Sequence, residues 1–321
     1  MTSKTEKNLL PIFTVDTPPY AHFGGSIQKM SRNMFIGLIP VIILSIMTYG
    51  LLSLRVMMLA IGTAVLTEAL CLYLADRENR IYDGTAMVAG LLFALLLPAG
   101  APWWLVIIGS SLSIAIGKQA FGGLGANPLC TPLVGWAILT ISWPTQMDPN
   151  AMVLGSNLID PLLKLKYFGV QSLPEGINSA LLLGEQLGGL GTGFIAAITL
   201  GGIYLLITRT IRPEATIAYF LGVLISGVIF WKIDPNTHIS PELYFLTGST
   251  VLMGFFFITD HASSPVSSIG LILFGLLAGI LTVLMRIYGI YADGAPFAVL
   301  LANLCTPLLD IIRPRPWGKR S

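Results

Sequence analysis

The side chains best able to do chemistry are a few carboxylates set in or beside long apolar stretches. Glu68 lies inside the apolar run that begins near Val56. A carboxylate at membrane depth is costly, so a functional role is its default interpretation, and Glu68 is a candidate for an ion pathway. Alternatively, Glu68 lies near a helix end and pairs with Arg77 or Arg80 at the membrane surface.

Three aspartates, Asp83, Asp260 and Asp293, each border an apolar run beside Gly or Thr. They could cap helix N-termini, or they could line a site for a cation or a cofactor. His261 follows Asp260 and begins a polar loop that is suited to hydrogen bonding with a ligand. An exposed loop would have a similar composition. The serines of this loop are Ser263, Ser264, Ser267 and Ser268.

Standard enzyme motifs are absent: the sequence has no Walker loop, no H-E-x-x-H and no G-x-S-x-G. The three cysteines, Cys71, Cys130 and Cys305, are far apart in sequence, so no zinc or iron–sulfur site is expected from this chain alone. The glycine-rich stretch 122–125 lacks the G-x-G-x-x-G spacing and indicates a tight, re-entrant break between membrane helices. We therefore expect neither catalytic residues nor a metal site.

The elements that position these side chains are membrane helices. Only 11% of the residues are charged and 54% are hydrophobic, whereas soluble domains are about a quarter charged. The net charge of +2 argues against nucleic-acid binding. We expect about ten apolar spans. They begin near Met34, Val56, Thr85, Trp103, Thr131, Gly191, Ala215, Tyr244, Ile269 and Pro296.

Two of these runs, 84–97 and 248–258, are short and stop at Pro98 and at Thr259. Interrupted helices are tolerated at membrane depth only where protein or a cavity surrounds them. The sequence therefore predicts a bundle with a buried site, rather than a set of plain anchors.

The basic residues predict the orientation. Ten spans with both termini in the cytoplasm place most of the 18 Lys and Arg residues on the cytoplasmic side, as the positive-inside rule requires. In this count Arg77, Lys118, Arg209 and Arg212 are loop charges at the cytoplasmic surface. Residues 1–33 contain prolines and charges but no apolar signal core, and are expected to form a cytoplasmic arm.

A weak internal repeat suggests the domain organisation. Residues 83–90 resemble 247–254, and 125–128 resemble 294–296. Five helices in each copy would force the second copy into the opposite orientation. The expected segments are the arm 1–33, a first five-helix repeat 34–144, an outer connecting loop 145–190, a second repeat 191–312 and a cytoplasmic tail 313–321.

Several segments carry a resemblance to a known family, in the same order along the chain. They are Ala101–Trp104, Lys118–Pro128, Ile141–Met147, Phe256–Asp260, Asp293–Asn303 and Arg313–Arg315. Together they resemble the D subunit of the Rnf ion-translocating electron transport complex, a family that includes the B subunit of the sodium-pumping NADH:quinone reductase. The resemblance runs from about Pro19 to Arg320, which is nearly the whole chain.

The resemblance implies an all-α membrane protein of ten helices in two inverted five-helix repeats, similar to urea transporters. It implies a subunit in the prokaryotic inner membrane, in a complex that couples electron transfer between ferredoxin and NAD to sodium or proton movement. The implied partners are the lipid bilayer and the other membrane and flavin or iron–sulfur subunits. The implied role is to carry a flavin, without stand-alone catalysis.

One position departs from the family. Relatives attach FMN through a phosphoester to a Thr in the loop between the repeats. The matching stretch here, 175–182, places Leu181 at that position, and Leu has no hydroxyl. Ser179 is a poor substitute, and Thr192 lies too close to the next helix. We expect no covalent FMN, unless the true register of this loop is different.

FMN or riboflavin, if present, would then be bound non-covalently, between apolar walls and a few polar groups. The candidate residues are Gly84, Thr85, Asn127, Thr259, Asp260, Ser263 and Ser264. Two other functions remain open. One is a solute channel or transporter with a urea-transporter-like fold, and the other is a structural subunit that has lost its flavin.

Overall fold

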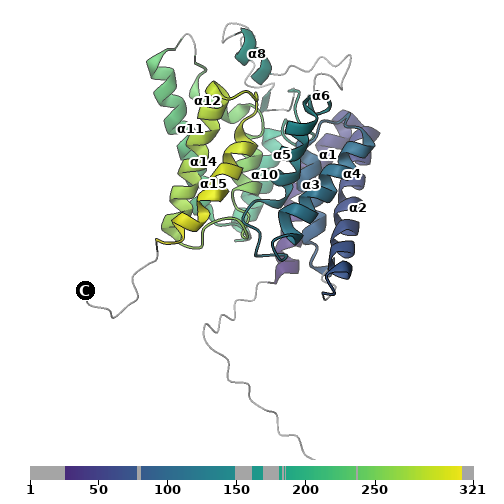
Figure 1. Ribbon diagram of the computed structural model, residues 1–321. Helices are drawn as coiled ribbons and strands as arrows, with labels where there is room; N and C mark the ends of the chain where they lie inside the picture. The colour runs from purple at the N-terminus through teal and green to yellow at the C-terminus, as the bar shows by residue number, and fades with distance from the viewer. Residues whose placement is uncertain are drawn as a thin grey trace, which may run out of the picture.

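The computed structural model describes residues 26–77, 81–148, 161–168, 181–182, 184, 186–235 and 238–312. Within these residues the chain is a helical bundle without a β-sheet (Figure 1). Each apolar run expected from the sequence contains helix, so the prediction of an all-helical membrane protein is confirmed. The arrangement of ten spans in two inverted repeats stays a prediction.

Four helices are long and apolar enough to cross a membrane, which takes about 20 residues. They are α1 (Ile27–Tyr49), α2 (Leu51–Leu74), α11 (Pro213–Ile233) and α14 (Ser268–Tyr288). Shorter helices lie between and beside them. These are α3 (Thr85–Leu96), α4 (Trp103–Ile114), α5 (Thr131–Ser142), α10 (Ile195–Ile207), α12 (Pro241–Leu246), α13 (Thr250–Leu252) and α15 (Ala295–Leu309).

The start of α1 lies within the stretch expected to be an arm. Ser26 caps this helix, because its hydroxyl accepts a hydrogen bond from the Lys29 backbone N–H at 3.1 Å. Helix therefore begins at Ile27, before the expected boundary at residue 34. The part of the arm before Ser26, and the tail 313–321, lie outside the described residues.

The residues at which the short helices begin and end have clear physical causes. Gly84 precedes α3 with a φ of 72°, a left-handed conformation that glycine adopts without strain. The helix ends at Leu96 because Pro98 disfavours helical geometry at the residue before it, and Leu97 is extended. Two helices pass into π-helical turns, η2 (Ala115–Gln119) after α4 and η4 (Met253–Phe257) after α13. Such turns are frequent at functional sites.

Close helix contacts depend on glycine. A Cβ on Gly201 of α10 would lie 2.0 Å from the Gly37 carbonyl oxygen of α1, and a Cβ on Gly279 of α14 would lie 2.3 Å from the Tyr219 carbonyl oxygen of α11. Membrane helices associate through such small residues, because they let the backbones approach closely. The first contact joins the long helix α1 to the short helix α10, and the second joins the long helices α11 and α14.

The two ends of the bundle differ. Helix α1 begins and α15 finishes at the same end, which is the lower end in Figure 1 and is called the terminal end below. The opposite end, called the loop end, carries α6 (Pro144–Met147), α8 (Pro161–Phe168) and α12. Cavities lined in part by polar side chains occur at both ends.

Candidate functional site at the terminal end

A buried ion pair lies toward the terminal end of α2. Glu68 and Lys118 are each 4% exposed. The Lys118 ammonium, on η2, donates to Glu68 Oε1, and it also donates to Thr85 Oγ1 at 2.8 Å. The Gln119 amide donates to the same Glu68 oxygen at 3.3 Å. Glu68 is thus neutralised within the bundle, as a buried carboxylate must be.

The surface pairing considered for Glu68 is not what the structure shows. Arg77 donates instead to the Gly122 carbonyl oxygen at 2.5 Å, and Arg80 lies outside the described residues. The partner is Lys118, which the sequence had suggested was a loop charge. Lys118 stands at the end of an apolar run, and this position could have indicated that its side chain is buried. The π-helical turn η2 directs the side chain back into the bundle.

The ion pair faces a cavity of about 430 Å³, called the Lys118 cavity. Two acids, Glu68 and Asp83, and two bases, Arg77 and Lys118, line it. The remaining lining residues are Ile27, Leu72, Thr85, Gln119, Gly122, Gly123 and Leu124. A polar, charge-balanced cavity of this kind suits a hydrated ion or the polar part of a ligand.

A second cavity of about 100 Å³, called the Asn127 pocket, shares Thr85, Lys118 and Leu124 with the first. Most of its walls are apolar. They include Met30, Met34, Val88, Ala89, Leu92, Pro132 and Phe256. The two π-helical turns meet at this pocket, since Lys118 belongs to η2 and Phe256 to η4.

Asn127 supplies an unused polar group to this pocket. Its side chain is 3% exposed, and its Nδ2 donates to the Leu129 carbonyl oxygen at 3.1 Å. Its Oδ1 has no hydrogen-bond partner among the described residues. A buried acceptor without a partner is costly and therefore calls for an explanation. A ligand N–H or O–H in the pocket would satisfy it.

Asp260 lines the far side of the Asn127 pocket, in the loop after η4. The Ser263 hydroxyl donates to Asp260 Oδ2 at 2.8 Å. Burial raises the pKa of Asp260 above its usual value, because desolvation penalises the charged carboxylate. Asp260 and Ser263 therefore act as one polar unit at the pocket wall.

Two predicted residues lie elsewhere. Thr259 and Ser264 line a separate hollow of about 80 Å³ that also includes Arg212 and His261. The Thr259 hydroxyl is already used, since it donates to the Phe255 carbonyl oxygen at 2.7 Å. The structure thus brings Thr85, Asn127 and Asp260 together from the predicted set. Ser263 is attached through Asp260, and Gly84 lies directly before Thr85.

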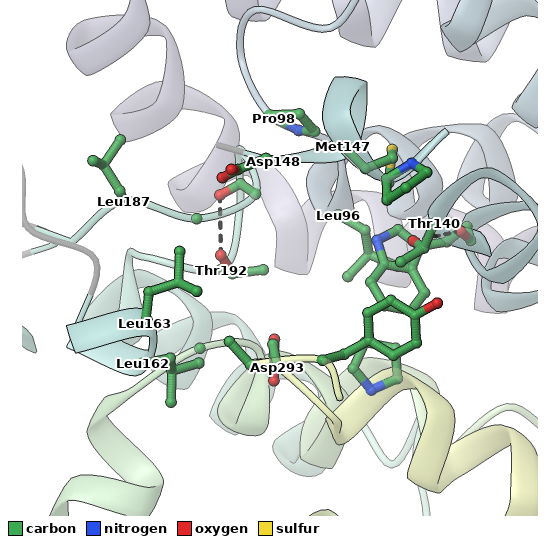
Figure 2. Close-up of a pocket in the computed structure, with 18 residues that line it drawn as sticks. Leu96, Pro98, Thr140, Met147, Asp148, Leu162, Leu163, Leu187, Thr192 and Asp293 are labelled. Atoms are coloured by element: carbon green, nitrogen blue, oxygen red, sulfur yellow. Dashed lines mark hydrogen bonds between the residues drawn. The ribbon is translucent and has the colours of Figure 1, made fainter. Parts of the chain in front are cut away.

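A further cavity, of about 220 Å³, lies at the loop end and is called the Asp293 cavity (Figure 2). Leu162 and Leu163 of α8 form one side of it, and Leu96 and Met147 lie across from them. The aromatic rings of Trp136 and Tyr291 also line it. Its polar residues are Thr140, Asp148, Thr192 and Asp293.

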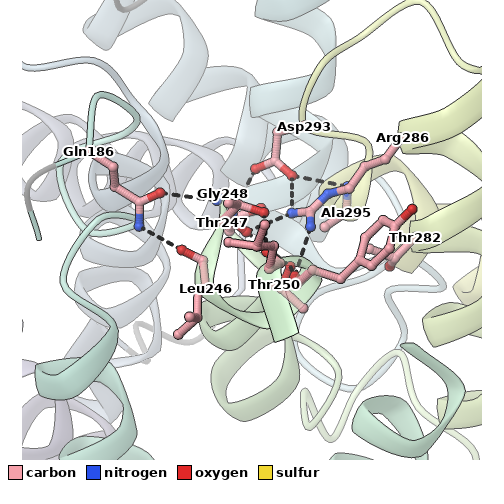
Figure 3. Close-up of polar contacts among 12 residues, drawn as sticks. Gln186, Leu246, Thr247, Gly248, Thr250, Thr282, Arg286, Asp293 and Ala295 are labelled. Atoms are coloured by element: carbon pink, nitrogen blue, oxygen red, sulfur yellow. Dashed lines mark hydrogen bonds and ion pairs between the residues drawn. The ribbon is translucent and has the colours of Figure 1, made fainter. Parts of the chain in front are cut away.

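Asp293 belongs to a network that holds the break between α12 and α13, called the Arg286 clasp (Figure 3). The Arg286 guanidinium is buried and donates to the Tyr244 carbonyl oxygen at 2.9 Å, the Thr247 carbonyl oxygen at 2.9 Å and Asp293 Oδ1 at 3.0 Å. Asp293 Oδ2 accepts from the Ser249 backbone N–H at 2.8 Å. Asp293 therefore binds a backbone N–H just before α13, a contact that links two separate segments.

Gln186 extends this network from the connecting segment. Its amide nitrogen donates to the Gly193 carbonyl oxygen at 3.2 Å, and its amide oxygen accepts from the Gly248 backbone N–H at 3.4 Å. Figure 3 shows Gln186 reaching toward Leu246 and Gly248 from the opposite side to Arg286. The sequence does not predict this role for Gln186, because the residue lies in the expected connecting loop, where a polar side chain is ordinary.

Leu181 is fully buried in the apolar core. Its position therefore offers neither a hydroxyl nor an exposed side chain. Ser179 and the rest of 175–180 lie outside the described residues. Thr192 is also buried, and its hydroxyl donates to the Gly189 carbonyl oxygen at 3.1 Å.

Comparison with known proteins covers nearly the whole chain. A family model described as the NQR2, RnfD, RnfE family matches residues 14–318. A protein of Salmonella arizonae, named as the D subunit of an ion-translocating oxidoreductase complex, is 31% identical over 350 residues, which covers 97% of this chain and 99% of the relative. A protein of Yersinia enterocolitica with the same name is 33% identical over 347 residues, covering 95% and 98%.

Proposed function

Because the chain belongs to the NQR2, RnfD, RnfE family, we propose that it is a membrane subunit of an Rnf-type ion-translocating oxidoreductase complex. The observation that carries this proposal is the family match over residues 14–318, with relatives named as the D subunit of such a complex aligned over almost their full lengths. Such a complex couples electron transfer between ferredoxin and NAD to the movement of sodium ions or protons. The other subunits of that complex are the expected partners.

The proposed topology is ten spans in two inverted repeats, 34–144 and 191–312, joined by the segment 145–190. The order in which helices pack on one another is similar in the two halves, which supports this topology. In the first half α2 packs on α4 and α4 on α5, and in the second half α11 packs on α14 and α14 on α15. The first helices of the two halves, α1 and α10, pack on each other. An even number of spans agrees with α1 beginning and α15 ending at one end (Figure 1).

The proposed location is the prokaryotic inner membrane, with the terminal end toward the cytoplasm. The positive-inside rule supports this orientation, since Lys29, Arg77, Arg209 and Arg212 belong to the segments at that end. The Lys118 cavity and the Asn127 pocket would then be open toward the cytoplasmic side. The Asp293 cavity would face the outer side.

The proposed cofactor is FMN or riboflavin, bound without a covalent bond in the Asn127 pocket. The residues fit a flavin, because apolar walls suit a planar ring system and the unused Asn127 Oδ1 suits a ring N–H. The Asn127 pocket alone, at about 100 Å³, is smaller than common ligand sites of roughly 300–1,000 Å³, so a flavin would extend from it into the adjoining Lys118 cavity of about 430 Å³. A flavin bound there would supply the electron transfer. The chain would hold it, orient it and exclude water.

Leu181 supports the view that no covalent flavin is attached between the repeats. Its side chain is buried in the core and lacks the oxygen that a phosphoester needs. Glu68 is the proposed entry point for the transported ion, supported by its burial, its pairing with Lys118 and the cavity that reaches it.

Deletion and complementation in the native organism tests the proposed function. Membranes that lack this chain should lose ferredoxin-dependent NAD reduction, and the tagged wild-type chain should restore it and co-purify with other subunits. Undiminished activity without the chain would reject the proposal. Solute uptake by the isolated chain in liposomes would instead favour a channel.

Intact mass and flavin release test the cofactor separately. The purified subunit should have the mass of the bare chain, and denaturation should release about one flavin per chain. Asn127→Ala should lower the flavin retained, whereas Ser264→Ala, which changes a different hollow, should leave it unchanged. A mass increased by one FMN phosphoryl group would reject non-covalent binding.

A further inference from the structure

Lys118 joins the two cavities at the terminal end. Its ammonium donates to Glu68 Oε1, which faces the Lys118 cavity, and its side chain also lines the Asn127 pocket. Thr85 lines both cavities as well and accepts from Lys118 at 2.8 Å. One flexible cation thus has two possible electrostatic partners, a carboxylate on one side and any negative group in the pocket on the other.

The ammonium occupies the position that a mobile cation would need. A cation at Glu68 would bind the carboxylate, and the Thr85 hydroxyl and Gln119 side chain lie beside it. Oxygen ligands of this kind suit hard cations such as Na⁺. While Lys118 stays on Glu68, the carboxylate is already neutralised and a second cation gains little there.

Two of the other charged groups around Lys118 have hydrogen-bond partners of their own. Arg77 is bonded to the Gly122 carbonyl oxygen, and Asp260 is bonded to Ser263 across the Asn127 pocket. Asp83 also lines the Lys118 cavity. Lysine, in contrast, carries its charge on a four-carbon stem that can reorient. Lys118 is therefore the charge best able to respond to a change in the pocket.

We propose that Lys118 is a movable counter-ion that couples the Asn127 pocket to Glu68. With no negative charge added to the pocket, the ammonium stays on Glu68 and keeps other cations out. A negative charge in the pocket draws the ammonium across, with Thr85 as a shared acceptor, and Glu68 becomes free to take Na⁺ or a proton from the Lys118 cavity. Charge balances, because one monovalent cation enters for each negative charge added.

This inference rests on the flavin and the ion entry point proposed above, and Lys118 acts in it as a positioning residue. The test uses the purified complex and the melting temperature of this subunit in NaCl and in choline chloride at equal ionic strength, over a range of pH. Lys118→Met should create a Na⁺-dependent or a pH-dependent stabilisation that the wild type lacks in its oxidised form. The two responses distinguish Na⁺ from a proton as the ion.

The size of the effect follows from the occupancy of Glu68. If Lys118 blocks Glu68 in most molecules, its removal should raise the apparent cation affinity by about tenfold or more. The double variant Lys118→Met with Glu68→Gln should lose the response, and Lys118→Arg should resemble the wild type. A Lys118→Met variant that responds no more than the double variant would overturn the proposal.

The wild type gives a second test that needs no substitution. Chemical reduction of the flavin-loaded complex should introduce the same Na⁺ or pH response, whereas identical responses before and after reduction would overturn the coupling. The proposed cofactor fails separately if the wild type releases no flavin. In that case the Lys118→Met response still decides whether Lys118 blocks Glu68.

Discussion

Replacing Arg286 with Met should destabilise the loop end, because it removes every donor that this guanidinium supplies to the α12–α13 break. The Tyr244 and Thr247 carbonyl oxygens and Asp293 would each lose a hydrogen bond. Breaking a buried ion pair by removing one partner costs about 3–5 kcal/mol. The lower end of this range applies for two reasons.

First, Asp293 is partly exposed, with 25% of its side-chain surface accessible, so water can replace part of the lost contact. Second, the Thr250 hydroxyl still donates to the Tyr244 carbonyl oxygen at 2.8 Å and to the Thr247 carbonyl oxygen at 3.2 Å. We therefore expect the free energy of unfolding to fall by about 3 kcal/mol. This value is similar to the cost of leaving one to three buried acceptors without a hydrogen bond. For a chain of 321 residues, this loss corresponds to a melting temperature lower by about 4 °C.

The assay is thermal unfolding of the purified subunit in detergent, followed by intrinsic fluorescence. Arg77→Met is the matched control, because Arg77 is exposed and makes one bond to a backbone carbonyl. Its effect should stay below about 1 kcal/mol. Arg286→Met combined with Thr250→Val should cost more than the sum of the single changes, since both donors to the same carbonyls are lost. A melting temperature for Arg286→Met equal to that of Arg77→Met would refute the reasoning.

Three further predictions concern single positions. Gly248→Ala should destabilise by about 2 kcal/mol, because its φ is 62° and a Cβ would lie 2.7 Å from Arg286 Nη2; Gly62→Ala, which meets nothing within 4 Å, should not lower the melting temperature. Asp260→Asn should raise the melting temperature at neutral pH. The raised pKa of Asp260 means that the folded state prefers the protonated carboxyl, so ionisation costs stability as pH rises from the unfolded value near 3.8. The difference in melting temperature between Asp260→Asn and the wild type should shrink as the pH of the measurement is lowered from about 7 toward about 4. A difference that does not change with pH would contradict a raised pKa for Asp260. Glu68→Gln should leave the subunit in the complex but lower the ion movement that accompanies ferredoxin-dependent NAD reduction in membrane vesicles, and unchanged coupling would exclude Glu68 from the pathway.

The sequence predicted the helices well, because long apolar runs and prolines have direct physical consequences. Pro98 ends α3 where expected, and the short run 248–258 contains helix from Thr250 to Phe257, ending before Thr259 as expected. The π-helical turns η2 and η4 were not predicted, since their hydrogen-bond pattern depends on packing around the terminal cavities. The early start of α1 at Ile27 depends on one capping serine, Ser26.

The candidate site was only partly visible in the sequence. Thr85, Asn127 and Asp260 are candidate cofactor-binding residues in the sequence because each is a polar residue beside an apolar run. The structure brings all three to one pocket. Thr259 and Ser264 share that property but face another hollow, because the loop after η4 turns them away. Lys118 was interpreted as a surface charge, and only three-dimensional packing shows that it neutralises Glu68.

The Glu68–Lys118 and Asp293–Arg286 ion pairs differ in a way that suits different roles. Arg286 is planar and is held by three acceptors on two segments, so moving it would break several bonds at once. Among the described residues, Lys118 donates to Glu68 and Thr85, beside a cavity that can supply a replacement cation. A fixed pair suits a structural clasp at the loop end, whereas an exchangeable pair suits ion uptake. Coupling between electron and ion movement is therefore expected at the terminal end, where the exchangeable charge lies beside the proposed cofactor pocket.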